Sequence, residues 1–190
     1  MASTLPPVTH QRIQIAGQLG VVNSAQLADL SRQIDVPFHL CCALLLGESS
    51  GGKNIYGHDQ GGVFSTSALG RPLDGVVTAR NFLEFFSQVV LSGKVSNGVG
   101  PCQITYAGVG RPRDGGFFRQ MFDRGLQPWV WEDNVRFGLG TILAGHLRFT
   151  KGDIAQAGTL FNAGTLAHGV TDYGRNLRKR DDAVKKAMGI

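Results

Sequence analysis

Glu48 is the side chain best placed to carry chemistry, because it is the only carboxylate in the apolar stretch that begins at Val36. It stands where this stretch gives way to Ser49-Ser50-Gly51-Gly52. A carboxyl group there is partly removed from water and close to the negative end of a helix dipole, and both effects disfavour its ionised form. We therefore expect Glu48 to hold a proton more readily than a surface glutamate does, as a general acid must at neutral pH. The alternative is a glutamate that merely ends a helix in solvent.

Three further blocks place single polar side chains in constrained surroundings. They are Gly100-Pro101-Cys102-Gln103-Ile104, Phe161-Asn162-Ala163-Gly164 and Tyr173, which follows 11 residues after Asn162. Together with Glu48-Ser49, their order resembles the lysozyme-like superfamily of goose-type lysozymes and soluble lytic transglycosylases. Members of that family show a buried helix ending in Glu-Ser, then a Gly-Leu-Met-Gln-Ile type turn, then Ala-Tyr-Asn-Ala-Gly, then a tyrosine. The four blocks span most of this chain.

The resemblance implies an enzyme that degrades peptidoglycan by cleaving the bond between N-acetylmuramic acid and N-acetylglucosamine. It implies that Glu48 is the catalytic acid, that Asn162 lines the cleft and that Tyr173 steadies the glutamate. It implies no cofactor. The full set expected to bind substrate is Ser49, Tyr56, His58, Gln103, Ile104, Asn162 and Tyr173. Three positions depart from the family's pattern while keeping apolar bulk, namely Pro101, Cys102 and Phe161.

The mechanism depends on a second carboxylate, because hydrolysis needs an activated water whereas lytic transglycosylation uses the sugar's own 6-hydroxyl. Asp59 is the best candidate, since it stands 11 residues past Glu48 in a glycine-flexed loop that resembles the Gly-Asp-rich loop of goose-type enzymes. In an inverting hydrolase the two carboxyl groups lie about 6.5 to 9.5 Å apart to admit the water. Asp74 is a weaker candidate, and either aspartate could instead cap a turn.

Other chemistries have weaker support in the sequence. His58 lies beside Asp59, but no His-Glu-x-x-His or Cys-x-x-Cys pattern completes a metal site. Cys102 with His146 or His168 would suit a cysteine peptidase, although Cys102 falls in a turn that the lysozyme-like pattern already explains. A non-catalytic glycan-binding module with the same fold is a further alternative.

The elements that must position these residues are mainly helical. Helices are predicted over 25–34, 38–46, 78–91, 114–124, 133–149, 153–161 and 172–188, from apolar residues at helical spacing and from capping residues such as Ser24. The run 38–46 is apolar all round, which is typical of a buried central helix. Glycine-rich irregular segments lie at 56–73 and 93–113. We therefore expect a mainly α, lysozyme-like domain around a buried helix, with long loops and room for a small β-hairpin.

Length and composition favour one globular domain. Of the 190 residues 42% are apolar and 17% are charged, which excludes the disordered and fibrous classes. We place the domain at 9–190, after a disordered lead at 1–8. The three cysteines, two of them adjacent, imply no disulfide framework.

The charge balance indicates the kind of partner. Nineteen Lys and Arg against 14 Asp and Glu give a net charge of +5, which favours a polyanion. With the lysozyme-like blocks, we expect the glycan strands of bacterial peptidoglycan, and neither a nucleic-acid motif nor a membrane-spanning stretch is present. The absence of a signal peptide fits a monomeric phage endolysin that accumulates in the host cytoplasm and reaches the wall through another protein's pore.

Overall fold

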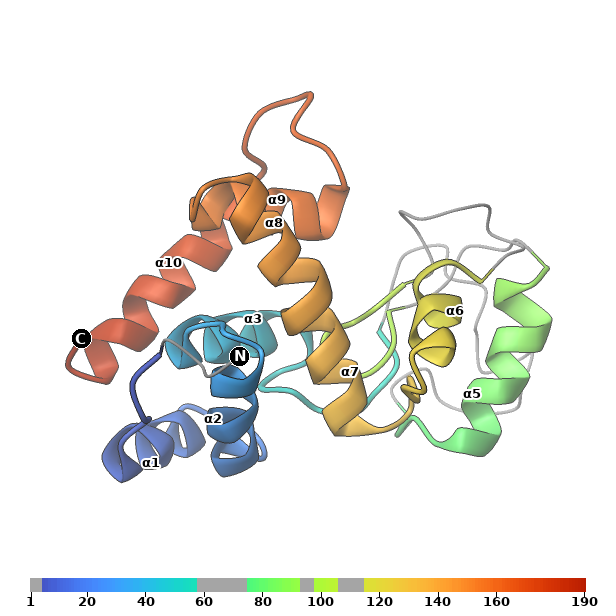
Figure 1. Cartoon of the computed structure of the whole chain (residues 1–190), viewed down its shortest axis with the longest axis horizontal. Helices are drawn as coiled ribbons and strands as arrows, with labels where there is room; N and C mark the ends of the chain where they lie inside the picture. Colours follow the sequence, from blue (N-terminus) through green and yellow to red (C-terminus); the bar gives the residue numbers. More distant parts are fainter. Residues whose placement is uncertain (1–4, 58–74, 93–97, 106–114) are drawn as a thin grey trace. The chain divides into compact units, whose positions relative to one another are not determined.

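The computed structural model describes residues 5–57, 75–92, 98–105 and 115–190. Within these ranges the regular secondary structure is helical, without a strand, which confirms the expected mainly α fold (Figure 1). The chain divides into two compact units. Unit 1 comprises Met1–Gly52 with Gly138–Ile190, and unit 2 comprises Lys53–Phe137. Of the helices in the described ranges, none has the length and apolar character needed to cross a lipid bilayer.

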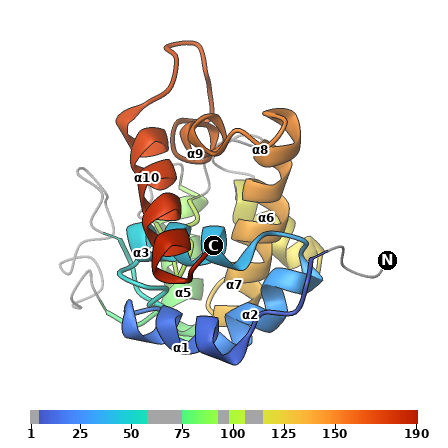
Figure 2. The same cartoon turned by 90° about the vertical axis from the view of Figure 1, so that its left-hand side faces the viewer.

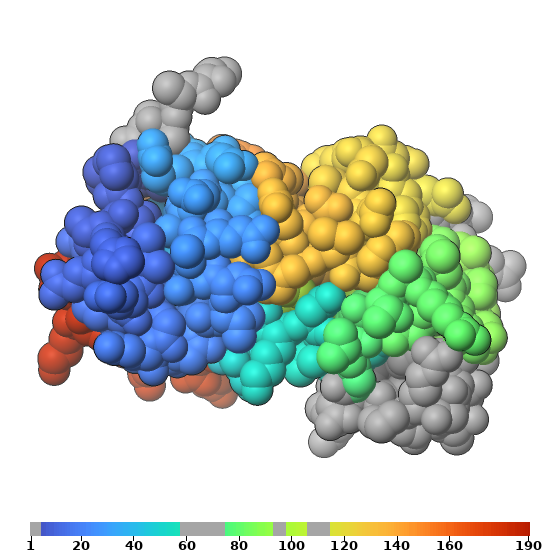
Figure 3. All heavy atoms as spheres, turned by 90° about the horizontal axis from the view of Figure 1, so that it is seen from below, coloured from blue at the N-terminus to red at the C-terminus, as the bar shows by residue number. Residues whose placement is uncertain are grey.

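Unit 1 is built from both ends of the chain. Figure 2 shows α9 and α10 side by side, and Figure 3 shows in blue the surface that α1 and α2 form. Because α10 also packs against α3, segments far apart in the sequence share one core. The helices of this unit are α1 (His10–Gln18), α2 (Ser24–Gln33), α3 (Phe38–Glu48), the π-helix η3 (Gly138–Leu143), α8 (Ala144–Phe149), α9 (Ile154–Ala163) and α10 (Asp172–Ala187).

Helix α3 forms the centre of the core of unit 1. From Phe38 to Leu45 every residue except His39 is buried, so the helix has no polar face. A helix of this kind must be covered on all sides, and both α2 and α10 pack against it. Each large aliphatic side chain buried here contributes about 1.5 to 3 kcal/mol. The burial confirms the predicted central helix, which continues beyond the predicted 38–46 run to include Glu48.

Helix α10 is amphipathic and covers α3 and α9. Its buried residues are Gly174, Leu177, Asp181 and Val184, which recur every three or four positions and so lie on one face. Asp181 is the one charged residue on that buried face. Its carboxylate must therefore find partners inside the unit.

Unit 2 is held together by aromatic side chains. Phe82 is fully buried, and the centre of its ring lies 5.2 Å from that of Phe118 and 5.6 Å from that of Trp129. In the described part of the unit, β-type backbone pairing is limited to three isolated antiparallel bridges, Ile55–Val76, Tyr56–Val99 and Val99–Ile104. The helices of unit 2 are α5 (Ala79–Phe85), the π-helix η1 (Phe86–Val90), α6 (Gly116–Asp123) and α7 (Trp131–Phe137).

The observed helices differ from the predicted ones in four places. Helix α1 has no counterpart in the prediction. The predicted helices at 78–91 and 133–149 each contain a π-helical segment, η1 and η3. The expected cap Ser24 is instead the first residue of α2. The capping position belongs to Asn23, which has a left-handed backbone (φ 53°) and makes no side-chain capping bond.

Candidate active site

The predicted site residues are divided between the two units. Unit 1 contains Glu48, Ser49, Asn162 and Tyr173, and unit 2 contains Tyr56, Gln103 and Ile104. His58 and Asp59 lie outside the described residues, as does the weaker candidate Asp74.

Glu48 and Tyr173 meet in unit 1. The hydroxyl of Tyr173 donates a hydrogen bond to Oε1 of Glu48. Glu48 is the last residue of α3, and Tyr173 lies in the first turn of α10. Both side chains are half-buried, neither sealed in the core nor fully in solvent. The fold thus brings together the predicted acid and the tyrosine predicted to steady it.

The turn after α3 fixes where Glu48 stands. Ser49, the C-cap, is buried, and its backbone N–H bonds to Leu45 O at 3.2 Å. The next residues, Ser50 to Gly52, all have positive φ, so the chain turns sharply away from the helix axis. A Cβ at Gly51 would overlap the carbonyl of Gly20, and only glycine permits this approach. The end of α3 is thereby attached to the segment between α1 and α2.

The start of α10 is fixed by a close crossing with α9. A Cβ at Gly174 would overlap the carbonyl oxygen of Ala155 and the hydroxyl of Thr159, so the two backbones approach where glycine leaves room. The Thr159 hydroxyl accepts a hydrogen bond from the backbone N–H of Thr171 at 3.1 Å. Thr171 in turn caps α10 by accepting from Gly174 N at 3.3 Å. Because Tyr173 lies between these two positions, the crossing sets its place.

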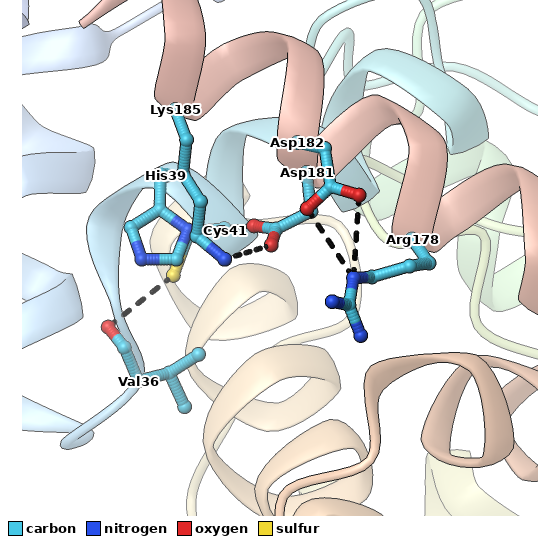
Figure 4. Close-up of polar contacts among 7 residues, drawn as sticks. All are labelled: Val36, His39, Cys41, Arg178, Asp181, Asp182 and Lys185. Atoms are coloured by element: carbon cyan, nitrogen blue, oxygen red, sulfur yellow. Dashed lines mark hydrogen bonds and ion pairs between the residues drawn. The ribbon is translucent and has the colours of Figure 1, made fainter. Parts of the chain in front are cut away.

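A second polar contact joins α3 to α10 at the other end of their interface. The carboxylate of Asp181 is fully buried and lies 2.6 Å from both His39 Nδ1 and Lys185 Nζ (Figure 4). Burial raises the pKa of Asp181, but the hydrogen bonds from His39 and Lys185 outweigh it, so the pKa lies below its usual value. The start of α3 thus pairs with the later part of α10, and the end of α3 with its start. The two helices run antiparallel with a fixed register.

Asn162 lies in the last turn of α9, the helix that crosses α10. Its side chain is exposed. Helix α9 ends at Ala163, and its C-cap Gly164 has a left-handed φ of 69°. The role of Asn162 in lining a cleft stays a prediction.

In unit 2, Tyr56 and Ile104 belong to the packed interior. Tyr56 is 1% exposed, its ring meets Phe85 edge-on at 5.6 Å, and its hydroxyl donates to Asn81 Oδ1 at 3.0 Å. Ile104 is 2% exposed, and its backbone pairs with that of Val99. These contacts support the unit from within. Substrate contact by either residue stays a prediction.

Gln103 and Asn134 shape the predicted turn at 100–104. Gln103 has a left-handed φ of 48°, and its Nε2 donates to the carbonyl oxygens of Ile55 and Gly100, at 3.1 and 2.8 Å. The buried Asn134 accepts from Cys102 N and donates to Val99 O, both at 3.0 Å. The expected constrained turn is therefore present. Within it, Gln103 has a left-handed backbone conformation, which residues other than glycine adopt only where surrounding contacts stabilise it.

The cysteine-peptidase alternative meets a physical obstacle. Cys102 is 0% exposed, so its thiol has no access to a substrate in this conformation. Burial also lowers the pKa of His146. Within the described residues, no group of three or more His, Cys, Asp or Glu side chains is arranged to hold a metal ion.

Sequence reasoning missed the part that Arg180 takes in this region. The available signal was spacing, since Arg180 stands seven residues after Tyr173 and therefore on the same face of α10. Its guanidinium carbon lies 5.8 Å from the centre of the Tyr173 ring.

The chain was compared with protein-family models, with curated proteins and with solved structures, and none of the three comparisons gives a match.

Proposed function

We propose that this chain is a peptidoglycan glycosidase that cleaves the bond between N-acetylmuramic acid and N-acetylglucosamine, with Glu48 as general acid. The observation that carries the proposal is the hydrogen bond from Tyr173 to Glu48 at the end of the buried helix α3. A phenol that donates to a half-buried carboxyl group holds it in one orientation, as proton transfer to a glycosidic oxygen requires. The ordered blocks around Glu48, Gln103, Asn162 and Tyr173 support the same assignment.

In the proposed reaction, Glu48 gives its proton to the bridging oxygen while the bond from the anomeric carbon to that oxygen breaks. An oxygen nucleophile then captures the positively charged anomeric carbon. In a hydrolase the nucleophile is water, whose proton passes to a second carboxylate, for which Asp59 is the candidate. In a lytic transglycosylase the nucleophile is the sugar's own 6-hydroxyl, whose proton returns to Glu48, and the product is a 1,6-anhydromuramyl sugar.

The decisive experiment is digestion of purified peptidoglycan by the wild-type chain and by Glu48→Gln, followed by mass spectrometry. We expect the wild type to release saccharide fragments and the variant to release none while keeping its circular dichroism and melting temperature. Glu84→Gln, on α5, is the matched control and should remain active. A product lighter by one water would identify a transglycosylase. A wild type that binds wall fragments and releases nothing would establish the non-catalytic module instead.

The proposed site of action is the bacterial wall, reached from the host cytoplasm during phage-induced lysis. The net charge of +5 favours adsorption to anionic wall polymers. Some exposed cations of α10 are paired within the helix, as Arg178 is with Asp182 at 3.2 Å. The proposed attraction to wall polymers is therefore assigned to the net charge of the whole surface and not to one basic patch. Binding to purified walls should therefore weaken as NaCl rises from about 0.05 to 0.5 M. Salt-independent sedimentation with the walls would contradict this part.

A further inference from the structure

Arg180 stands next to Tyr173 and to Gly47, the residue that precedes Glu48. Its guanidinium carbon lies 5.8 Å from the centre of the Tyr173 ring. The same group rests on the last turn of α3, because a Cβ built at Gly47 would overlap three of its atoms, Cζ, Nη1 and Nη2. Arg180 therefore touches the residue that precedes Glu48 and also the residue that hydrogen-bonds to Glu48.

The guanidinium is incompletely hydrogen-bonded. Its Nε and Nη2 atoms are buried, and neither has a hydrogen-bond partner in the part of the chain that the structure describes. Its neighbours on the helix behave differently, since Arg175 pairs with Asp172 and Arg178 with Asp182. Buried donors without partners destabilise a fold. A fold that keeps such donors therefore calls for an explanation, and functional sites are one place where they are expected.

Gly47 is the residue that makes room for this arrangement. It lies inside α3 and is absent from the positions with left-handed φ, so the backbone itself does not demand glycine. Glycine inside a helix is less stable than alanine. Glycine at position 47 is therefore explained by the guanidinium of Arg180, which occupies the space that a side chain would need.

We propose that Arg180 is a positioning residue. Its guanidinium packs against Gly47 and holds the Tyr173 ring in the place where the Tyr173 hydroxyl can donate its hydrogen bond to Glu48. A planar cation that contacts the ring restricts its rotation, and the bonded carboxyl group is then restricted with it. The catalytic consequence rests on the proposed function. The placement of Tyr173 does not.

The kinetic test compares Arg180→Met with the wild type on soluble peptidoglycan fragments. Methionine keeps the apolar stem but removes the planar cation. We expect kcat to fall by about 10- to 100-fold, because a small misplacement of a reacting group has effects of this size, with KM changed less than about threefold. Arg178→Met removes the same charge from an exposed position on the same helix and should leave both constants unchanged. An unchanged kcat in Arg180→Met would overturn the proposal.

The stability of the same variants separates positioning from ordinary structural support. Because Arg180→Met removes two unsatisfied buried donors, its melting temperature should equal or exceed that of the wild type. A residue that only supported the fold would lower both the melting temperature and the activity. A large fall in melting temperature would therefore count against the proposal.

A readout independent of activity follows Tyr173 directly. In protein labelled with 13C at the Cζ of tyrosine, Tyr173→Phe identifies the Tyr173 signal among the three tyrosines. Arg180→Met should move that signal, whereas Arg178→Met should not. If the signal moves while the wild type cleaves no glycan, the positioning stands and the proposed function fails. If the signal does not move, the positioning itself is wrong, whatever the activity.

Gly47→Ala provides a second route to the same displacement. An alanine side chain at this position collides with the guanidinium, so kcat should fall about as far as in Arg180→Met. In the double variant Gly47→Ala/Arg180→Met the guanidinium is absent, so the alanine has nothing to collide with. Its kcat should therefore fall no further than in either single variant. Losses that multiply in the double variant would show that the two residues act separately and would refute the inference.

Discussion

The carboxylate of Asp181 is fully buried and lies 2.6 Å from Nδ1 of His39, across the interface of α10 with α3. The hydrogen bond between Tyr173 and Glu48 lies at the opposite end of the same interface. Two specific polar contacts therefore fix how far α10 can slide along α3. A shift by one helical turn, about 5.4 Å, would break both contacts and move Tyr173 away from the candidate acid.

Removing the Asp181 carboxylate should destabilise the chain strongly. In Asp181→Ala, His39 and Lys185 lose their shared partner inside a largely buried contact, and we expect the free energy of unfolding to fall by about 3 kcal/mol. Urea unfolding followed by circular dichroism measures this value. Asp182→Ala is the matched control, because its exposed pair with Arg178 should contribute less than about 1 kcal/mol. Equal losses in the two variants would contradict the buried contact.

The same carboxylate predicts a pH dependence of stability. The pKa of Asp181 is below its usual value because bonds from His39 and Lys185 outweigh burial. A carboxyl group with a lower pKa in the folded state stabilises the protein above its unfolded pKa, about 3.9, and this stabilisation is lost as pH falls through the folded value. The free energy of unfolding should thus drop below about pH 4, less steeply in Asp181→Ala. Urea titrations between pH 7 and 2.5 compare the two. Parallel curves would show that Asp181 is not responsible.

The close crossing of α9 and α10 should tolerate no side chain at Gly174. A methyl group there meets the carbonyl oxygen of Ala155 and the Thr159 hydroxyl, so Gly174→Ala should lower the free energy of unfolding by about 1 to 3 kcal/mol. It should also reduce activity by displacing Tyr173. Gly145→Ala, in α8, meets no atom within 4 Å and should stabilise by about 0.5 to 1 kcal/mol. A neutral Gly174→Ala would show that the helices can separate without cost.

Much of the helical arrangement could be predicted because apolar spacing reports burial directly. The run after Pro37, apolar except for His39, can be stable only in the centre of a core, and α3 lies there. Helix α1 escaped prediction because its apolar residues Ile13 and Ile15 are two positions apart and only Ala16 is buried. The available signal was Thr9, which caps α1 by accepting from Arg12 N at 3.4 Å.

The candidate site was predictable only in part. An ordered set of short motifs pointed to Glu48 and Tyr173, and the fold brings these two residues together. The packing of the Arg180 guanidinium against Gly47 was not predictable. It depends on the antiparallel register of α3 and α10, which local spacing in the sequence does not specify. The inward roles of Tyr56 and Gln103 depend on tertiary partners in the same way.

The buried thiols allow a direct test of the cysteine-peptidase alternative. Cys41, Cys42 and Cys102 are each 0% exposed, and burial raises the pKa of Cys42 to about 12. Because only an accessible thiolate reacts with iodoacetamide, the native chain should remain unmodified at pH 8, whereas all three cysteines should be alkylated in urea. Intact-mass spectrometry distinguishes the two states. Cys102→Ser should also retain the ability to release saccharides from peptidoglycan. Rapid alkylation of Cys102 in the native chain, with loss of lysis, would restore the peptidase interpretation at the expense of Glu48.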